Sequence, residues 1–130
     1  MFSSMDFANF VPEFMKNVKA AFYVEEANLY FTCDDAGVGD MRVFVLSPRA
    51  EQRCHLHGKN EGVTELEVVF NFDGYPPELL MQMYHMARCK REYERTGEKA
   101  RHVEFADHRS KMLRLFDDYR ASVATKASLS

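Results

Sequence analysis

The chain has no tryptophan, few prolines and no long apolar stretch among its 130 residues. A helix that crosses a bilayer needs roughly 20 consecutive apolar residues, so the sequence predicts no membrane span. The first ten residues, MFSSMDFANF, also lack the basic stretch and the unbroken apolar core of a secretory signal. We therefore expect a cytoplasmic protein.

Cysteine is scarce too. The three cysteines, Cys33, Cys54 and Cys89, are widely spaced and odd in number. A small secreted protein held by disulfides would have more cysteines at closer spacing. We expect three reduced thiols that behave as small apolar side chains.

Local catalytic motifs are also missing. The chain has no G-x-S-x-G elbow, no phosphate-binding P-loop and no G-x-G-x-x-G fingerprint. The stretch DDAGVGD contains Asp34, Asp35 and Asp40, but their spacing does not match a calcium-binding EF-hand loop. We interpret residues 34–40 as a turn, and we expect neither an enzyme nor a bound cofactor.

The composition is that of a globular domain with a divided charge. Hydrophobic residues make up 46% of the chain, with 11 Phe and 8 Met, which is enough for an apolar core. Residues 1–87 carry 6 Lys or Arg against 13 Asp or Glu, whereas residues 88–130 carry 11 against 7. Since the basic part is interleaved with acids, we interpret the division as an acidic sheet beside basic helices.

Three segments show helical periodicity. Residues 9–22 have an apolar stripe, a capping Asn9 and a proline in the first turn. Residues 77–96 begin at a Pro-Pro pair and end at Gly97. Residues 103–124 form the last predicted helix. The short polar tail, residues 125–130, is expected to fray.

Between the first two predicted helices, the apolar residues alternate as they do in strands. The predicted strands are residues 29–33, 41–47, a short 53–57 and 64–72, with a turn at 59–62. In the last of these strands the apolar and acidic positions alternate, which predicts one buried face and one wet face. The predicted buried residues are Leu66, Val68, Phe70 and Phe72, and the predicted exposed residues are Glu65 and Glu67.

This order of elements predicts an α+β fold. We expect a small antiparallel sheet of three or four strands, with one N-terminal helix and two C-terminal helices on one face. Residues 1–124 would form a single domain. The last two helices would pair as a hairpin, which can present a surface to a partner or to a second copy of the chain.

Two short stretches, CHLHG and HMARC, contain zinc-ligating side chains: Cys54, His57, His85 and Cys89. Together they make a tetrahedral set. However, strand alternation would place Cys54 and His57 on opposite faces, and His85 and Cys89 lie off the apolar stripe of their helix. We therefore expect no closed zinc site, and we keep zinc as an alternative.

A second metal arrangement uses His55 and His57, which share a face at i, i+2 in a strand. The third ligand would be His85, Asp73 or Glu61. The spacing of these residues does not choose among them.

The predicted helix 77–96 and the residues after it also carry a basic set that could contact a phosphate backbone. Glu92 and Glu94 sit among these residues and can pair with Arg88 and Lys90 at i, i+4. A solvated helix with ion pairs is therefore preferred over a nucleic-acid surface. The basic set consists of Arg88, Arg91, Arg95, Lys99 and Arg101.

The sequence leaves three hypotheses for function. The first is a small protein that acts by binding another protein, with a basic protein as one candidate partner, as an inhibitor, immunity-type antagonist, adaptor or chaperone of bacterial or phage kind. The second is a nucleic-acid-binding accessory protein, and the third is a small zinc protein. For the first hypothesis the candidate binding residues are Asp34, Asp35, Asp40, Glu65, Glu67, His85, Cys89 and Tyr93.

Overall fold

The computed structural model describes residues 22–37, 40–48, 52–59 and 62–129. The predicted helix 9–22 lies outside these residues except at its end. Its last residue, Phe22, is the first residue of a strand, because it pairs with Phe31 in an antiparallel hairpin. The ring of Phe22 stacks on that of Phe31 with 5.5 Å between the centroids.

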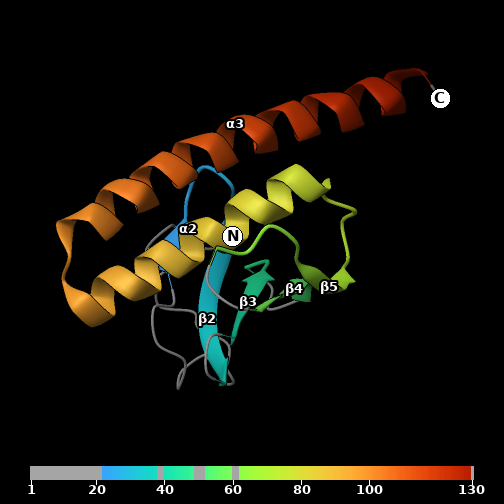
Figure 1. The fold of residues 1–130 in the computed structure, drawn as a ribbon. Coiled ribbons are helices and arrows are strands. Elements are labelled where there is room, and N and C mark those ends of the chain that lie inside the picture. The colour runs from blue at the N-terminus through green and yellow to red at the C-terminus, as the bar shows by residue number, and fades with distance from the viewer. Residues whose placement is uncertain (1–21, 38–39, 49–51, 60–61, 130) are drawn as a thin grey trace.

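The described strands form one antiparallel sheet in the order of the chain (Figure 1). They are β1 (Phe22–Val24), β2 (Leu29–Gly37), β3 (Asp40–Leu46), β4 (Gln52–Lys59) and β5 (Glu67–Asn71). The α+β class and the antiparallel pairing are confirmed, but the sheet has five strands rather than three or four. β1 was not predicted, and the short segment 53–57 is a full strand.

The predicted turn at residues 34–40 is mostly strand, because β2 continues to Gly37 and β3 starts at Asp40. Asp34 lies opposite Arg42, and the two side chains form an ion pair across the strands. Opposite charges that face each other across a sheet stabilise the pairing. Asp34, which was predicted to lie in a turn, is therefore part of a strand, and Arg42 balances its charge there.

Two helices follow the sheet. α2 (Pro77–Thr96) has the predicted bounds, and it ends at Gly97 with a φ of 74° and a bond from the Gly97 N–H to the Tyr93 carbonyl. α3 (Lys99–Leu129) is longer at both ends than the predicted 103–124. No helix in the described ranges is long and apolar enough to cross a membrane.

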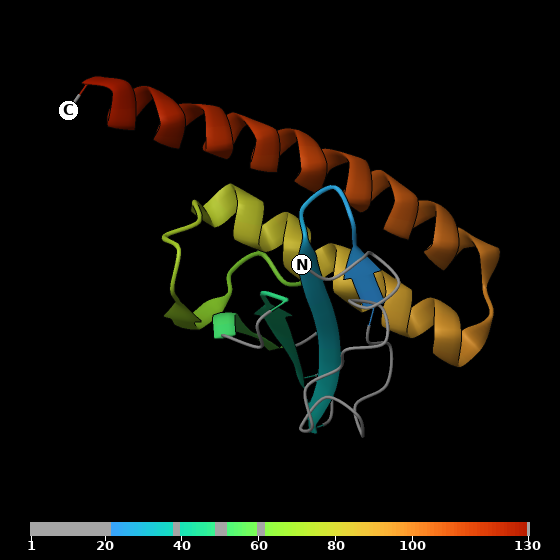
Figure 2. The same ribbon diagram turned by 180° about the vertical axis from the view of Figure 1, so that it is seen from behind.

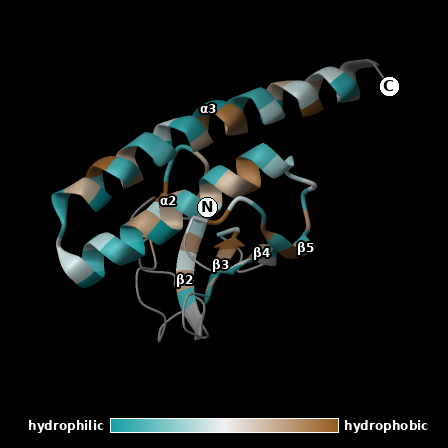
Figure 3. Ribbon diagram, viewed as in Figure 1, coloured by the Kyte–Doolittle hydropathy of each residue, from teal (hydrophilic) through white to brown (hydrophobic). Residues whose placement is uncertain are grey.

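The helices stack as two further layers on one face of the sheet. α2 contacts β2, β3 and β4, and α3 lies antiparallel along the outer side of α2 (Figures 1 and 2). α3 is mostly hydrophilic along its length, as expected for the outer layer (Figure 3). The β1–β2 turn reaches α3, where both carboxylate oxygens of Glu26 accept hydrogen bonds from Arg109 at 2.6 Å.

The core lies between the sheet and α2 and closes against α3. Its fully buried side chains come from β2, β3, β4 and both helices. Phe116 of α3 is also buried, whereas Val123, about two turns further along the same helix, is 47% exposed. The largest apolar members with no exposed surface are Phe31, Val43, Val45, Leu56, Leu79, Met83, Met86 and Met112.

The last strand is shorter and more exposed than predicted. Val68, Phe70 and Phe72 are 44%, 42% and 63% exposed, so the prediction that they are buried is wrong, and Leu66 is only partly buried. Glu65 and Glu67 are exposed, as predicted. β5 is the last strand of the described sheet and α2 does not cover it in the way that it covers β2 to β4.

A bulge adds a second reason for this exposure. His55 pairs with Phe70, and the next residue of β4, Leu56, pairs with Val68, so Val69 is an extra residue in β5. Residues opposite each other in a sheet point to the same face. Val68 therefore points to the α2 side with Leu56, and Phe70 points to the other face with His55. The uniform apolar face that the sequence suggested is split in two.

Gly58 in β4 allows the tightest contact between the sheet and α2. A Cβ atom at this position would overlap Oη and Cζ of Tyr84 and lie 2.7 Å from its Cε2. Tyr84 has no exposed surface, so its ring cannot move aside. The absence of a side chain at Gly58 lets α2 approach the sheet.

We predict that Gly58→Ala lowers the free energy of unfolding by about 1–3 kcal/mol, as overpacking of a dense core does. Chemical denaturation measures the change. Tyr84→Leu removes the colliding ring atoms, so adding Gly58→Ala to Tyr84→Leu should cost much less than adding it to the wild type. Equal costs in the two backgrounds would contradict the contact.

Candidate functional site

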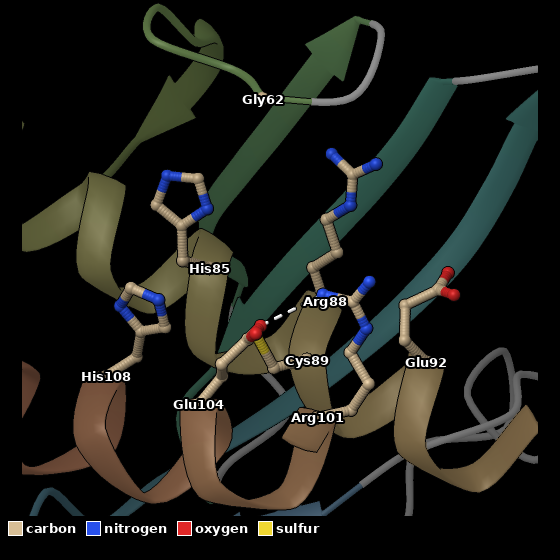
Figure 4. A pocket seen from close by; sticks show the side chains of 8 residues that line it. All are labelled: Gly62, His85, Arg88, Cys89, Glu92, Arg101, Glu104 and His108. Atoms are coloured by element: carbon tan, nitrogen blue, oxygen red, sulfur yellow. Dashed lines mark hydrogen bonds and ion pairs between the residues drawn. The ribbon is translucent and has the colours of Figure 1, made fainter. Parts of the chain in front are cut away.

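A polar pocket of about 280 Å³ lies where α2 and α3 meet (Figure 4). It contains two of the residues that the sequence singled out, His85 and Cys89. Two residues of α3 face them. His108 pairs with His85, and Glu104 pairs with Cys89, so that two pairs connect the helices. The lining residues are Gly62, His85, Arg88, Cys89, Glu92, Arg101, Glu104 and His108.

The first cross-helix pair consists of two histidines. The rings of His85 and His108 stack with 5.2 Å between centroids, and His108 Nδ1 lies 2.7 Å from the side-chain oxygen of Gln82. Burial lowers the pKa of both histidines. His108 and Arg88 lower that of His85 further, and Lys111 does the same for His108. The two rings therefore meet as neutral groups near pH 7.

The second cross-helix pair joins a thiol and a carboxylate. Cys89 Sγ lies 3.7 Å from Glu104 Oε2, and Arg101 Nη1 lies 3.0 Å from the same oxygen. Burial and the Glu104 charge raise the pKa of Cys89 to about 11. A thiol must ionise to act as a nucleophile. Cys89 is therefore held as a neutral hydrogen-bond donor.

The acids of the pocket are balanced by arginines. Glu104 pairs with Arg101, and Glu92 pairs with Arg95 one turn away. These contacts join residues within each helix, while the two cross-helix pairs join α2 to α3. The pocket is thus a polar seam that holds the outer helix, and it presents no activated nucleophile.

The structure does not bring together the four residues of the alternative zinc site, Cys54, His57, His85 and Cys89. In β4, Cys54 faces the helices beside Val45, and His57 points to the other face. Cys54 contacts Asn71 Oδ1 at 3.5 Å, whereas His85 and Cys89 line the pocket at α3. Within the described ranges, no group of three or more His, Cys, Asp or Glu is arranged to hold a metal ion.

The second metal arrangement is also dispersed. His55 and His57 share a face, as their spacing predicted, but His85 lies on α2 on the opposite side of the sheet. Asp73 is engaged with Arg53 at 2.5 Å and with the Tyr75 hydroxyl at 2.8 Å. The remaining candidate, Glu61, lies outside the described residues.

The acidic candidates of the sheet have basic neighbours. Asp34 pairs with Arg42. His57 lies between two acids, with Nε2 3.6 Å from Asp40 Oδ2 and Nδ1 3.4 Å from Glu67 Oε2. These contacts divide the predicted acidic surface into local pairs. Glu65 is exposed beside the first turns of α2. The side chain of Asp35 is not among those that the structure describes.

The basic candidates of the helices are paired in a similar way. Arg95 pairs with Glu92, and Arg101 approaches Glu98 and Glu104. Lys90 Nζ lies 3.3 Å from Glu94 Oε1, as the i, i+4 spacing predicted. Arg88 and Arg91 also have interaction partners, whereas Lys99 is exposed. Tyr93 packs on His102 across the hairpin, with 5.0 Å between the rings.

Sequence patterns did not predict the exposed apolar surface at the β5 edge of the described sheet. Four large apolar side chains in β5 and just after it are between 42% and 63% exposed. We call the three side chains that follow Val68 the β5 apolar surface. The bulge and the lack of cover by α2 cause this exposure, and neither leaves a local signal in the sequence. The members are Val69, Phe70 and Phe72, whereas Val68 points to the α2 side of the sheet with Leu56.

Comparisons with known proteins find no protein family, no curated protein and no solved structure that matches this chain.

The three thiols should be slow to react in the folded protein. Cys33, Cys54 and Cys89 are buried, and burial raises the pKa of Cys54 to about 12. We predict that a disulfide reagent at pH 8 labels the folded chain at least about tenfold more slowly than free cysteine. After denaturation without reductant it should label three thiols. Rapid labelling of the folded wild type would contradict this prediction. If Cys89→Ser were labelled equally fast, the reactive thiol would be Cys33 or Cys54.

The histidine pair should make stability depend on pH. Because the pKa of both histidines is lowered in the folded state, the unfolded chain binds protons more readily than the folded chain below about pH 6.5. We predict that the free energy of unfolding is highest above pH 7 and falls between about pH 6.5 and 5. Denaturant titrations at several pH values measure this slope.

His108→Gln should flatten that dependence, because it removes one proton site of the pair. His102→Gln, an exposed α3 histidine, is the matched control and should leave the slope unchanged. Some dependence will remain in both variants, since burial also lowers the pKa of His55. An unchanged slope in His108→Gln would contradict the assignment.

Proposed function

We propose that this protein acts by binding another protein, and that the β5 apolar surface is where the partner binds. The observation that carries this proposal is the exposure of Val69, Phe70 and Phe72, which are 55%, 42% and 63% exposed in or just after the last strand of the described sheet. The rings of Phe70 and Phe72 pack together, and exposed apolar side chains that touch one another are characteristic of protein interaction sites.

The energetics favour a protein partner. Moving a large apolar side chain from water to a packed interface contributes about 1.5–3 kcal/mol. Val69, Phe70 and Phe72 together could therefore supply several kcal/mol to a complex. A partner with an apolar centre would gain this energy, whereas a nucleic-acid backbone would leave these side chains in water.

The aromatic part of the surface is already ordered. The rings of Phe70 and Phe72 are 5.7 Å apart, and the Arg53 guanidinium lies 6.0 Å from the centre of the Phe72 ring. Arg53 is in turn fixed by Asp73 at 2.5 Å. Binding therefore has to immobilise few side chains, which lowers its entropic cost. Aromatic residues and arginine are also enriched at the centres of protein interfaces.

The edge of β5 favours side-chain contacts over extended strand pairing. The extra residue Val69 breaks the ladder between His55 and Leu56. Bulges and short edge strands discourage the open-ended pairing that leads to aggregation. We infer that the partner packs on the side chains, and that the exposed Glu65 and Glu67 favour basic residues at the rim of its surface.

The other two hypotheses have less support. The pocket thiol Cys89 is protonated, so nothing in the pocket favours an enzyme. Arg95 and Arg101 of the basic set are paired with acids, which reduces the field available to a phosphate backbone. The small size and the apolar edge suit an inhibitor, antagonist, adaptor or chaperone.

The test is an affinity capture of the tagged full chain from the source cell, with and without nuclease. The wild type should capture a defined protein in both conditions. Phe70→Ser with Phe72→Ser should reduce the captured amount at least about tenfold, because it removes the centre of the β5 apolar surface. Thermal unfolding should change little, since both side chains are exposed.

Val103→Ser with Val123→Ser is the matched control, because these α3 side chains are 66% and 47% exposed. It should leave the capture unchanged. Equal capture by the β5 variant and the control would contradict the proposed surface. Loss of the captured protein with nuclease would favour the nucleic-acid hypothesis instead.

A further inference from the structure

The exposed side of α2 has a groove on each flank of its first two turns. The groove between α2 and the segment leading into β5 has a volume of about 320 Å³, and the groove between α2 and α3 has a volume of about 430 Å³. Both grooves are lined by Pro77 and Met81, so the exposed part of α2 forms a ridge between them. We call Pro77, Glu78 and Met81 the α2 ridge.

The groove on the α3 side combines an apolar surface with opposite charges on its two walls. Met81 and Leu115 supply apolar surface. The α2 wall carries Glu78, and the α3 wall carries Lys111 and Arg114. Among the described residues, neither Glu78 nor Arg114 forms an ion pair, whereas Lys111 is 3.0 Å from Asp107. An acid and a base are therefore available on the same face.

We propose that this face is the interface of a homodimer, in which the α2 ridge of one copy packs into the α3-side groove of the other. Ridge-into-groove contacts are the ordinary way in which helices pack. A two-fold axis parallel to α2 and displaced toward α3 places Glu78 of each copy beside Arg114 of the other. The same contact then occurs twice, as in any two-fold interface.

The charges are what select a second copy as the occupant. A partner for this face must place an acid against Lys111 and Arg114 of the α3 wall, and a base against Glu78 of the α2 ridge. This chain carries both features side by side, and a two-fold rotation aligns both at once. Met81 of each copy would be buried at the centre, which adds apolar area to the two ion pairs.

The inference does not rest on the proposed function. The register of β4 and β5 places Phe70 on the face of the sheet opposite α2, and Phe72 packs beside it. Dimerisation through α2 and α3 would leave these two rings accessible to another protein. The two surfaces can therefore be tested separately.

The experiment measures the molar mass of the purified full chain by light scattering and sedimentation, over about 1 to 100 µM. We expect the wild type to reach twice the chain mass of 15.1 kDa within this range. Glu78→Arg alone and Arg114→Glu alone should each raise the dissociation constant at least about tenfold, because each places like charges together at two symmetric contacts. Circular dichroism should show that both variants remain folded.

Mixing the two variants gives the decisive result. In a mixed dimer, Arg at position 78 of one chain meets Glu at position 114 of the other, and the native Glu78 meets the native Arg114. The mixture should therefore dimerise at least about tenfold more tightly than either variant alone, and the double variant Glu78→Arg with Arg114→Glu should dimerise by itself. Glu98→Arg, just beyond the C-terminal end of α2 and away from both grooves, is the control and should dimerise as the wild type does.

A wild type that stays monomeric throughout the range would overturn the proposal. So would a dimer that neither single variant weakens, because its interface would lie elsewhere. Failure of the mixture to dimerise would exclude the two-fold arrangement.

Discussion

The packing of α2 on two sides is the constraint on which the rest of the structure depends. Its buried side chains Leu79, Met83 and Met86 belong to the main core, and its other flank meets α3 through the pairs His85–His108 and Cys89–Glu104. The close approach at Gly58 brings α2 down onto the sheet. The described residues leave one side of its N-terminal turns uncovered, and these turns form the ridge between the two grooves.

Much of the fold was predictable, because local patterns determine it. The Pro-Pro start and the glycine stop defined α2, and alternation located β2 and β3. β1 was missed since its first residue, Phe22, is also the last apolar position of a helical pattern, and only pairing with β2 identifies this segment as a strand. The burial of β5 was predicted wrongly because one extra residue, Val69, reverses the face of Phe70 relative to Val68. A bulge of this kind depends on the partner strand and leaves no mark in a single sequence.

The candidate site shows the same division between local and long-range information. The i, i+4 spacing of His85 and Cys89 correctly indicated that they lie together on one side of a helix. Their neighbours, Glu104 and His108, come from another helix and are also four residues apart. Two polar pairs at the same spacing on adjacent antiparallel helices could therefore have predicted that they face each other. Strand alternation correctly separated Cys54 from His57. Which helix face would meet α3 could not be derived, because α3 has no strong apolar side of its own.

The extra residue in β5 also has an evolutionary consequence. His55 and Leu56 are consecutive, and so their partners Phe70 and Val68 would be consecutive in a regular ladder if Val69 were deleted. The bulge therefore has the form of a single-residue insertion that leaves the surrounding register intact. The sheet itself does not require a particular side chain at this position, and Val69 is 55% exposed. In related chains, position 69 should therefore vary more than positions 56 and 58 of β4, because Leu56 and Gly58 are constrained by the core.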